Sequence, residues 1–229
     1  MSRPDRIHRF TRGERALHWL LAATFLAMLA TGLVLSVPSL APLLARPDAK
    51  AVHLGAAWAL AAGTLALAAV HGRRLLATVR ELEVFDRDDL RWLRGVPARV
   101  TGAGPPAPPQ GRFNAGQKLN TAVVTGLMAV AYVTGGLMWL GERDHAFRFP
   151  GTVLVHDWTM YLLVVLVAGH LHMALVNPST RPALRGMLRG DVDRAWARRH
   201  HAKWVARDED PQGGPPGGRD GGRPGTPQA

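Results

Sequence analysis

The chain has 229 residues, of which 47% are hydrophobic, yet it carries a formal net charge of +11 and contains no cysteine. The absence of cysteine excludes disulfides, thiolate metal sites, iron–sulfur clusters and covalently attached c-type haem. The basic charge does not indicate a nucleic-acid-binding protein, because the sequence has no zinc-finger spacing, RNP-type aromatic motif or basic recognition helix.

Four apolar blocks, separated by arginine-rich stretches, predict an all-α membrane protein, a four-transmembrane-helix bundle. Each block has about 20 residues, enough to span the hydrocarbon core at about 1.5 Å per residue. We expect the first helix to be retained rather than cleaved as a signal peptide, because its apolar run is long and no small-residue cleavage site ends it. The predicted helices cover residues 16–36, 52–71, 119–140 and 153–176.

Lysine and arginine predict the orientation of these helices. The stretch before the first helix carries five of them, the long loop after the second helix nine and the C-terminal region ten, whereas each of the two other loops carries two. The positive-inside rule therefore places both termini and the long loop in the cytoplasm. We expect a multi-pass protein of the bacterial inner membrane, in contact with lipid and not with nucleic acid.

The regions outside the four blocks are predicted to lie at the cytoplasmic surface. The stretch "ATVRELEVFDRDDLRWLRG" suits an amphipathic helix, and the Pro/Gly-rich "VTGAGPPAPPQG" after it is expected to be irregular. Residues 180–205 are predicted to be a basic amphipathic segment along the membrane interface. Residues 1–207 would form one domain, and residues 208–229, with seven Gly and five Pro, a disordered tail.

Four of the six histidines inside the apolar blocks are the candidate functional residues, because an imidazole in hydrocarbon is costly and usually functional. His156 and His170 lie 14 residues apart on one face of the fourth helix, a separation of roughly 21 Å along the axis. His18 on the first helix matches the depth of His170, and His53 on the second helix matches that of His156. Two facing pairs of neutral imidazoles suit the axial positions of two haem irons.

Other interpretations of the histidines remain open at this point. A single membrane histidine can merely hydrogen-bond to a neighbouring helix. His172 lies on the opposite face of the fourth helix and would replace His170 if that helix were rotated. His71 lies at the membrane edge beside Arg73 and Arg74, which favours an interfacial role. The histidines outside the blocks are expected to be solvated: His8, His145, His200 and His201.

Six short motifs make the chain resemble the gamma subunit of membrane-bound formate dehydrogenase, a four-helix di-haem cytochrome b related to cytochrome b561. The resemblance covers residues 8–205. It implies that His53 and His156 hold the iron of an outer haem b and that His18 and His170 hold that of a cytoplasmic-side haem b. The motifs are "RALHW", "VHLGAAW", "FNAGQKLN", "VHDWTM", "GHLHMAL" and "GDVDRAWARRHHAKW".

The resemblance also implies a role in respiratory electron transfer. Such subunits take electrons from an iron–sulfur beta subunit outside, which is fed by a molybdenum or tungsten alpha subunit that oxidises formate, and pass them through both haems to menaquinone or ubiquinone. The chain would be the quinone-reducing subunit of an oxidoreductase complex and would not itself oxidise formate. The alternatives are a cytochrome b of a hydrogenase or another periplasmic dehydrogenase, or a haem-free transporter that uses the histidines for protons or metal.

A quinone site is implied beside His170, at the "NAGQK" motif with Asn114, Gly116 and Gln117. The Asn114 amide, at the cytoplasmic start of the third helix, can hydrogen-bond to a quinone carbonyl as that oxygen gains negative charge. By residue type alone Asn114 is better explained as an N-cap. Asp157, beside the outer histidine, is unexplained: it can hydrogen-bond to a histidine ring or face the aqueous edge.

Overall fold

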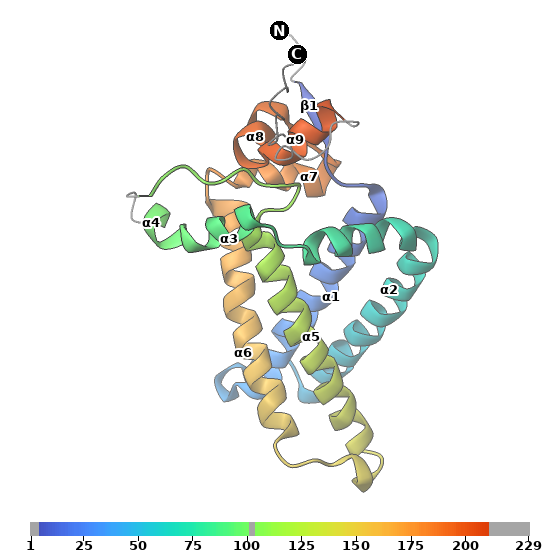
Figure 1. Cartoon of the computed structure of the whole chain (residues 1–229). Helices are drawn as coiled ribbons and strands as arrows, with labels where there is room; N and C mark the ends of the chain where they lie inside the picture. Colours follow the sequence, from blue (N-terminus) through green and yellow to red (C-terminus); the bar gives the residue numbers. More distant parts are fainter. Residues whose placement is uncertain (1–4, 101–103, 211–229) are drawn as a thin grey trace, which may run out of the picture.

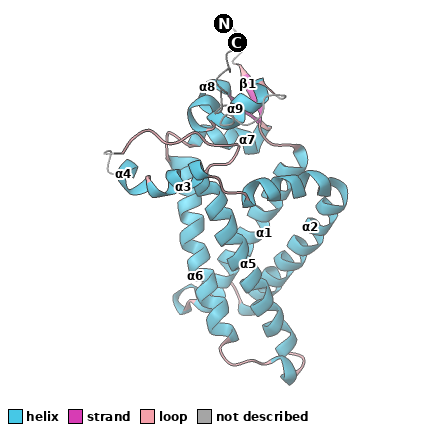
Figure 2. Cartoon of the chain, in the orientation of Figure 1, coloured by secondary structure: helices cyan, strands magenta, loops and turns pink. Residues whose placement is uncertain are grey.

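Four long helices dominate the structure, a computed structural model that describes residues 5–100 and 104–210 (Figure 1). Figure 2 shows that most of this part of the chain is helical. All four helices are long and apolar enough to cross a membrane, which confirms the predicted fold of four membrane helices. They are α1 (Arg12–Ser36), α2 (Arg46–Glu83), α5 (Ala115–Gly141) and α6 (Thr152–Leu171), which continues into the π-helical turn η3 (His172–Val176).

The long helices form two antiparallel pairs. α1 packs mainly on α2 and α5 packs mainly on α6, while smaller contacts join α1 to α6 and α2 to α5. In Figure 1, α5 and α6 run side by side and α2 slopes away from them. Large apolar side chains such as Trp58, Leu65 and Val165 are exposed, as expected for a surface that faces lipid.

Shorter elements connect and cover these helices. The first strand and the last helices lie together at one end of the bundle (Figure 1). α9 ends at Glu209, so the domain boundary predicted at residue 207 falls inside a helix, and the predicted tail from 211 onward lies outside the described residues. The shorter elements are β1 (Arg6–His8), η1 (Pro38–Leu43), α3 (Arg87–Arg94), α4 (Val96–Val100), η2 (His145–Phe147), η4 (Arg181–Ala183), α7 (Leu184–Arg189), β2 (Asp191–Asp193), α8 (Arg194–His200) and α9 (Ala202–Glu209).

The amphipathic helix predicted after the second membrane helix is divided between two elements. Its first half continues α2, which is therefore longer than the predicted residues 52–71. Figure 1 shows α2 bending so that its last part runs across the end of the bundle. Its second half is α3, which begins after Asp86 because the Asp86 and Asp89 side chains form a reciprocal capping box there.

α1 and α5 both begin earlier than predicted, because each starts at a capping box. The Thr11 side chain accepts a hydrogen bond from the Glu14 amide, and the Glu14 carboxylate accepts one from the Thr11 amide. Asn114 and Gln117 make the same exchange at the start of α5. Each box satisfies two backbone N–H groups that would otherwise have no partner in the helix.

The C-terminal segment is not a single amphipathic element along the interface, as residues 180–205 were predicted to be. It folds into short helices and a strand, and β2 pairs antiparallel with β1 in a two-stranded sheet that the all-α prediction missed. Gly190 turns the chain into β2 with a φ of 92°, and a Cβ there would lie 2.9 Å from the Phe10 carbonyl oxygen, so the turn requires glycine. A small core holds this region together: Ile7, Val192, Trp196, Ala197 and Val205.

A buried arginine, Arg9, joins this C-terminal region to the N-terminal segment. Its guanidinium donates to the Arg112 carbonyl at 2.7 Å and lies 3.1 Å from His201 Nε2. It also lies over the rings of Trp196 and Trp204, a favourable cation–π arrangement. Burial lowers the pKa of Arg9 to about 9, which still leaves the group charged at neutral pH.

His201 is the partner of Arg9, and the prediction that it is solvated was wrong. The residue is 1% exposed, and its Nδ1 lies 2.7 Å from the Gly111 carbonyl oxygen. Burial lowers the pKa of His201 to about 3, so the ring is neutral. Because a carbonyl oxygen only accepts, Nδ1 carries the proton, and Nε2 accepts a hydrogen bond from Arg9.

Candidate functional site

One pair of membrane histidines lies near the end of the bundle that holds the sheet. His18 comes from the first turns of α1 and His170 from the end of α6, and their ring centroids are 6.3 Å apart. α1 is anchored there by Trp19, whose indole nitrogen donates to the Met187 carbonyl of α7. α6 turns into the π-helical η3 directly after this pair. The structure therefore brings together two residues that are 152 positions apart in the sequence.

The other pair lies toward the opposite end of the bundle. His53 comes from the start of α2 and His156 from the start of α6, with ring centroids 6.2 Å apart. Both pairs thus use α6, and their members on α6 are separated by 14 residues, or roughly 21 Å of helix.

The spacing of both pairs fits a metal ion between the rings. Two metal–nitrogen bonds of about 2 Å, plus the radius of each ring, separate the centroids of two facing imidazoles by about 6 Å. Among residues 5–100 and 104–210, no group of three or more His, Cys, Asp or Glu side chains could hold a metal ion. Each metal would therefore need further ligands from elsewhere, and a porphyrin would supply them, with the two histidines of each pair as the residues that would hold the group.

In the His53–His156 pair, the Nδ1 atom of each ring lies within hydrogen-bond distance of a threonine hydroxyl group. His53 Nδ1 lies 3.0 Å from the Thr31 hydroxyl oxygen of α1, and His156 Nδ1 lies 2.9 Å from the Thr134 hydroxyl oxygen of α5. Neither threonine was predicted from the sequence to be part of the site. Each stands 22 residues before its histidine, a spacing that could have drawn attention to them.

The remaining membrane histidines are not part of either pair. In the part of the chain that the structure describes, the His172 side chain makes no hydrogen bond or ring contact, so His170 and not His172 is the residue opposite His18. His71 packs closely against α1, where a Cβ on Gly13 would come within 2.6 Å of its ring.

Asp157 joins two helices rather than a histidine. Its carboxylate accepts a hydrogen bond from Ser36 Oγ at 3.0 Å, which ties the last residue of α1 to the second turn of α6. The suggestion that Asp157 bonds to a histidine ring was wrong for His156, because the Nδ1 of that ring pairs with Thr134 instead. Its carboxylate holds α6 in place beside the His53–His156 pair.

The "NAGQK" motif lies at the start of α5. Asn114 and Gln117 use their side-chain oxygens in the capping box, and within the described residues their amide nitrogens donate to no other group. Gly116 lies against the Trp92 ring of α3, where a Cβ would be 3.0 Å away, so a larger residue would push against that ring. The amide N–H groups of this motif are thus available to a ligand.

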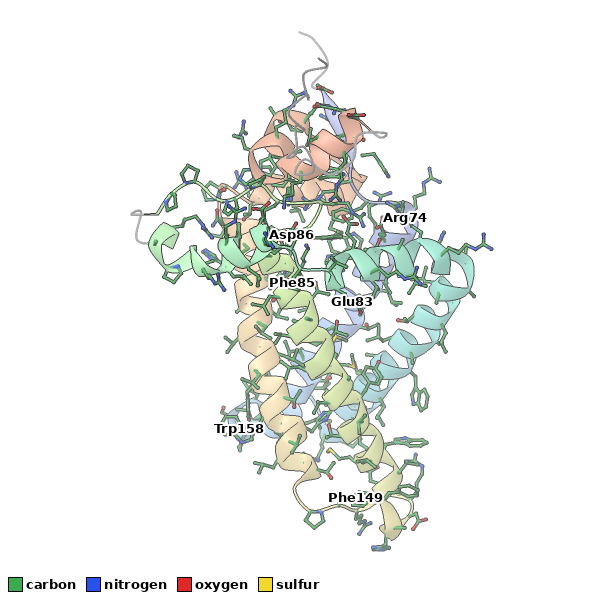
Figure 3. All side chains as sticks on the ribbon, viewed as in Figure 1. Arg74, Glu83, Phe85, Asp86, Phe149 and Trp158 are labelled. Atoms are coloured by element: carbon green, nitrogen blue, oxygen red, sulfur yellow. The ribbon has the colours of Figure 1, made fainter. Side chains whose placement is uncertain are left out.

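Two buried ion pairs fix this end of the bundle, and neither was found from the sequence. Lys118 Nζ lies 2.6 Å from the Asp89 carboxylate and also donates to the Val84 carbonyl, which docks α3 on α5. Arg112 Nη1 lies 2.7 Å from the Glu14 carboxylate, which stands one helical turn before His18 on α1. Figure 3 shows this end crowded with polar side chains around Arg74 and Asp86, whereas Phe149 and Trp158 mark the opposite end.

Glu14 and Arg112 belong to a wider network, the Arg112 cluster, made of Arg112, Glu14, Thr78 and Glu81. Arg112 donates to the carboxylates of Glu14 and Glu81 and to the Thr78 hydroxyl, and Thr78 donates to Glu14. The cluster ties the first turn of α1 to the last turns of α2 and to the segment before α5. It therefore fixes the position of His18 relative to the rest of the bundle.

Comparisons with known proteins agree with a haem-binding membrane bundle. The pattern of the prokaryotic cytochrome b561 family matches residues 9–190. The chain is 26% identical over 215 residues to the formate dehydrogenase cytochrome b556 subunit of Haemophilus influenzae, covering 91% of this chain and 86% of that protein. It is 26% identical over 211 residues to the formate dehydrogenase cytochrome b556(fdo) subunit of Escherichia coli K12, covering 89% and 94%.

A third relative, which matches over a shorter stretch, is also a formate dehydrogenase cytochrome b556 subunit. The chain is 29% identical over 129 residues to the cytochrome b556 subunit of nitrate-inducible formate dehydrogenase from Escherichia coli K12, covering 54% of this chain and 57% of that protein. The family pattern spans most of the chain, and the four membrane helices and paired histidines suit a cytochrome b. The chain belongs to the prokaryotic cytochrome b561 family.

Proposed function

We propose that the chain is the membrane cytochrome b subunit of a respiratory formate dehydrogenase, which carries electrons from a periplasmic iron–sulfur subunit through two b haems to quinone near the cytoplasmic side. The observation that carries this proposal is the presence of two facing histidine pairs at opposite ends of α6. The relatives named as formate dehydrogenase subunits support the identity of the complex. Its catalytic alpha and iron–sulfur beta subunits would be the partners of this chain.

The distribution of charge supports the orientation. The end of α2, α3 and the C-terminal helices gather arginine and lysine at the end of the bundle near His18 and His170. By the positive-inside rule this end faces the cytoplasm, with both termini. The His18–His170 pair is then the cytoplasmic-side pair, and the His53–His156 pair is the outer pair.

The two histidines of each pair would have one task in this proposal, which is to hold the iron of a haem b. A bound haem b supplies a one-electron redox centre. α6 fixes the spacing of the two centres, since it contributes His156 to one and His170 to the other. Glu14 and Arg112 fix the cytoplasmic end of α1, and Ser36 with Asp157 fixes its outer end.

Asn114, Gly116 and Gln117 would form the quinone site beside His170. The side-chain oxygens of Asn114 and Gln117 serve the capping box, whereas the amide N–H groups are available to donate to a quinone carbonyl. The capping role and the quinone role therefore use different atoms of one side chain and do not compete. Donation to an oxygen that gains negative charge favours reduction of the quinone.

The Asn114→Asp variant separates these two roles. Aspartate caps a helix about as well as asparagine, so we expect the stability to change by less than about 0.5 kcal/mol. Because the carboxylate has no N–H to donate, we expect quinone reduction to slow by roughly tenfold to a hundredfold. Asn120→Asp, which puts the same charge on the same helix, is the control. If Asn114→Asp reduced quinone at the wild-type rate, the quinone role would be contradicted and Asn114 would act only as a helix cap.

Purification of the complex from native membranes tests the proposed function. We expect two b-type haems per chain in the reduced-minus-oxidised spectrum, reduction of both by formate, and co-purification of a molybdenum- or tungsten-containing subunit with an iron–sulfur subunit. One haem or none would contradict the assignment of the histidine pairs. A partner that oxidises hydrogen or another substrate would keep the haem sites and overturn the identity of the complex.

A further inference from the structure

The two histidines of the outer pair are held in the same way by two different helices. Thr31 on α1 contacts His53 Nδ1, and Thr134 on α5 contacts His156 Nδ1. The threonines are 5% and 8% exposed, so both contacts are shielded from solvent. The sequence separation is 22 residues in both cases, which means that the α1–α2 and α5–α6 pairs repeat one local arrangement.

The hydroxyl groups settle which atom donates in these contacts. Thr31 Oγ1 lies 2.7 Å from the Ala27 carbonyl oxygen, and Thr134 Oγ1 lies 2.7 Å from the Val130 carbonyl oxygen. A hydroxyl has one hydrogen, and a carbonyl can only accept, so each threonine donates its hydrogen to its own helix. The threonine oxygen therefore accepts from the histidine, and each ring carries its hydrogen on Nδ1. The lone pair of each neutral ring is then on Nε2, free to bind a metal.

A glycine follows each threonine and faces the same histidine ring. A Cβ on Gly32 would lie 3.6 Å from His53 Cε1, and a Cβ on Gly135 would lie 3.2 Å from His156 Cε1. The second distance is tight enough that a methyl group would move the ring. Gly135 therefore lets the His156 ring approach α5 closely, whereas the distance at Gly32 is an ordinary contact with His53.

The cytoplasmic-side pair lacks this arrangement. Within residues 5–100 and 104–210, neither His18 nor His170 makes a side-chain hydrogen bond, although their rings are separated by nearly the same distance as the outer pair. The two pairs therefore differ not in spacing but in what holds the second nitrogen of each ring.

We propose that Thr31 and Thr134 are positioning residues that fix the tautomer of both outer histidines and lower the reduction potential of the outer haem relative to the inner one. This inference rests on the proposed function, since it takes His53 and His156 as haem ligands. A histidine that donates its other N–H is a stronger ligand, and a stronger ligand favours the oxidised iron. The asymmetry would favour electron flow from the outer to the inner site.

Isosteric variants test this proposal on the purified, haem-loaded complex. The outer haem is identified first, as the haem that a His53→Ala variant lacks. In Thr31→Val and in Thr134→Val we expect the midpoint potential of this haem to rise and that of the other haem to stay unchanged. We expect the double variant to lose haem affinity by roughly tenfold or more. Thr31→Ser keeps the accepting oxygen and should behave as the wild type. Thr24→Val is the matched control, because the Thr24 hydroxyl also donates to its own helix but contacts no histidine.

The outcomes separate this inference from the proposed function. A wild-type chain without two haems overturns the proposed function itself. Two haems in the wild type, with potentials that do not change in either valine variant, overturn the role of the threonines alone. Equal shifts of both haems, or a shift in Thr24→Val as large as in Thr31→Val, would show a general packing effect and also overturn it. Because Thr31 and Thr134 lie on different helices, a failure of one variant to fold leaves the other as a complete test.

Discussion

His53→Ala is expected to remove one haem and leave the other in place. The His53 ring faces the His156 ring at a centroid distance of 6.2 Å. In the described part of the chain, His53 is the only histidine whose ring contacts that of His156. Alanine provides no ligand, and no third His, Cys, Asp or Glu side chain among the described residues is grouped with the pair to take its place. We therefore expect the haem content per chain to fall by about half, with transfer from the partner to quinone abolished because the path is interrupted.

The haem that remains is the informative part of that experiment. The His18–His170 pair lies at the other end of α6, so its spectrum and midpoint potential should be retained in His53→Ala. His18→Ala should give the reciprocal result, with only the outer haem present. His172→Ala, which replaces the first residue of η3, a histidine that joins neither pair, is the control and should keep both haems. Loss of both haems in His53→Ala with the fold intact, or of one in His172→Ala, would contradict the pairing.

The pairing of the histidines followed from the sequence because it depends on helix geometry alone. Four long apolar blocks fix the depth of each residue in the membrane, and the helical repeat fixes its face. Depth and face together leave few ways to pair four histidines. The structure brings His18 opposite His170 and His53 opposite His156, as that argument required.

What the sequence did not reveal depends on contacts between distant segments. The fold of the C-terminal segment onto β1 is fixed by Arg9, which is buried among residues nearly two hundred positions away in sequence, such as Trp196 and His201. An arginine beside a predicted membrane helix is expected to be a solvated charge, and nothing local indicates otherwise. The division between α2 and α3 was different, since Asp86 and Asp89 form a local capping signal that the sequence does contain.

The threonines illustrate a third case. Thr31 and Thr134 are apolar-block residues of a common type, and each normally bonds to its own helix. Two features distinguish them from Thr24: the repeated separation of 22 residues to a histidine, and the glycine that follows each of them. The pattern is visible in the sequence once the pairing is known, but its meaning depends on the distance between two helices.

Arg112→Met is expected to destabilise the bundle by about 3 kcal/mol, because it removes the close cation of the buried Glu14 carboxylate and leaves only Arg74, 3.8 Å away and half exposed. The Arg112 and Glu14 side chains are 6% and 4% exposed, so water cannot replace the lost partner. Glu14 lies one turn from His18 on α1, and we therefore expect the cytoplasmic-side haem to be lost at a lower temperature than the outer haem. Thermal unfolding in detergent, followed by tryptophan fluorescence and by the haem spectrum, measures both effects.

The double variant Glu14→Gln/Arg112→Met distinguishes an ion-pair effect from simple loss of packing. Removing both charges leaves no buried unpaired group, so the double variant should be clearly more stable than Arg112→Met alone. Arg198→Met is the control, because the Arg198–Glu209 pair is 59% and 45% exposed and should contribute less than about 1 kcal/mol. If the double variant were as unstable as Arg112→Met, the loss of stability would come from the contacts of Arg112 with Thr78 and Glu81 of α2, and not from the charge of Glu14.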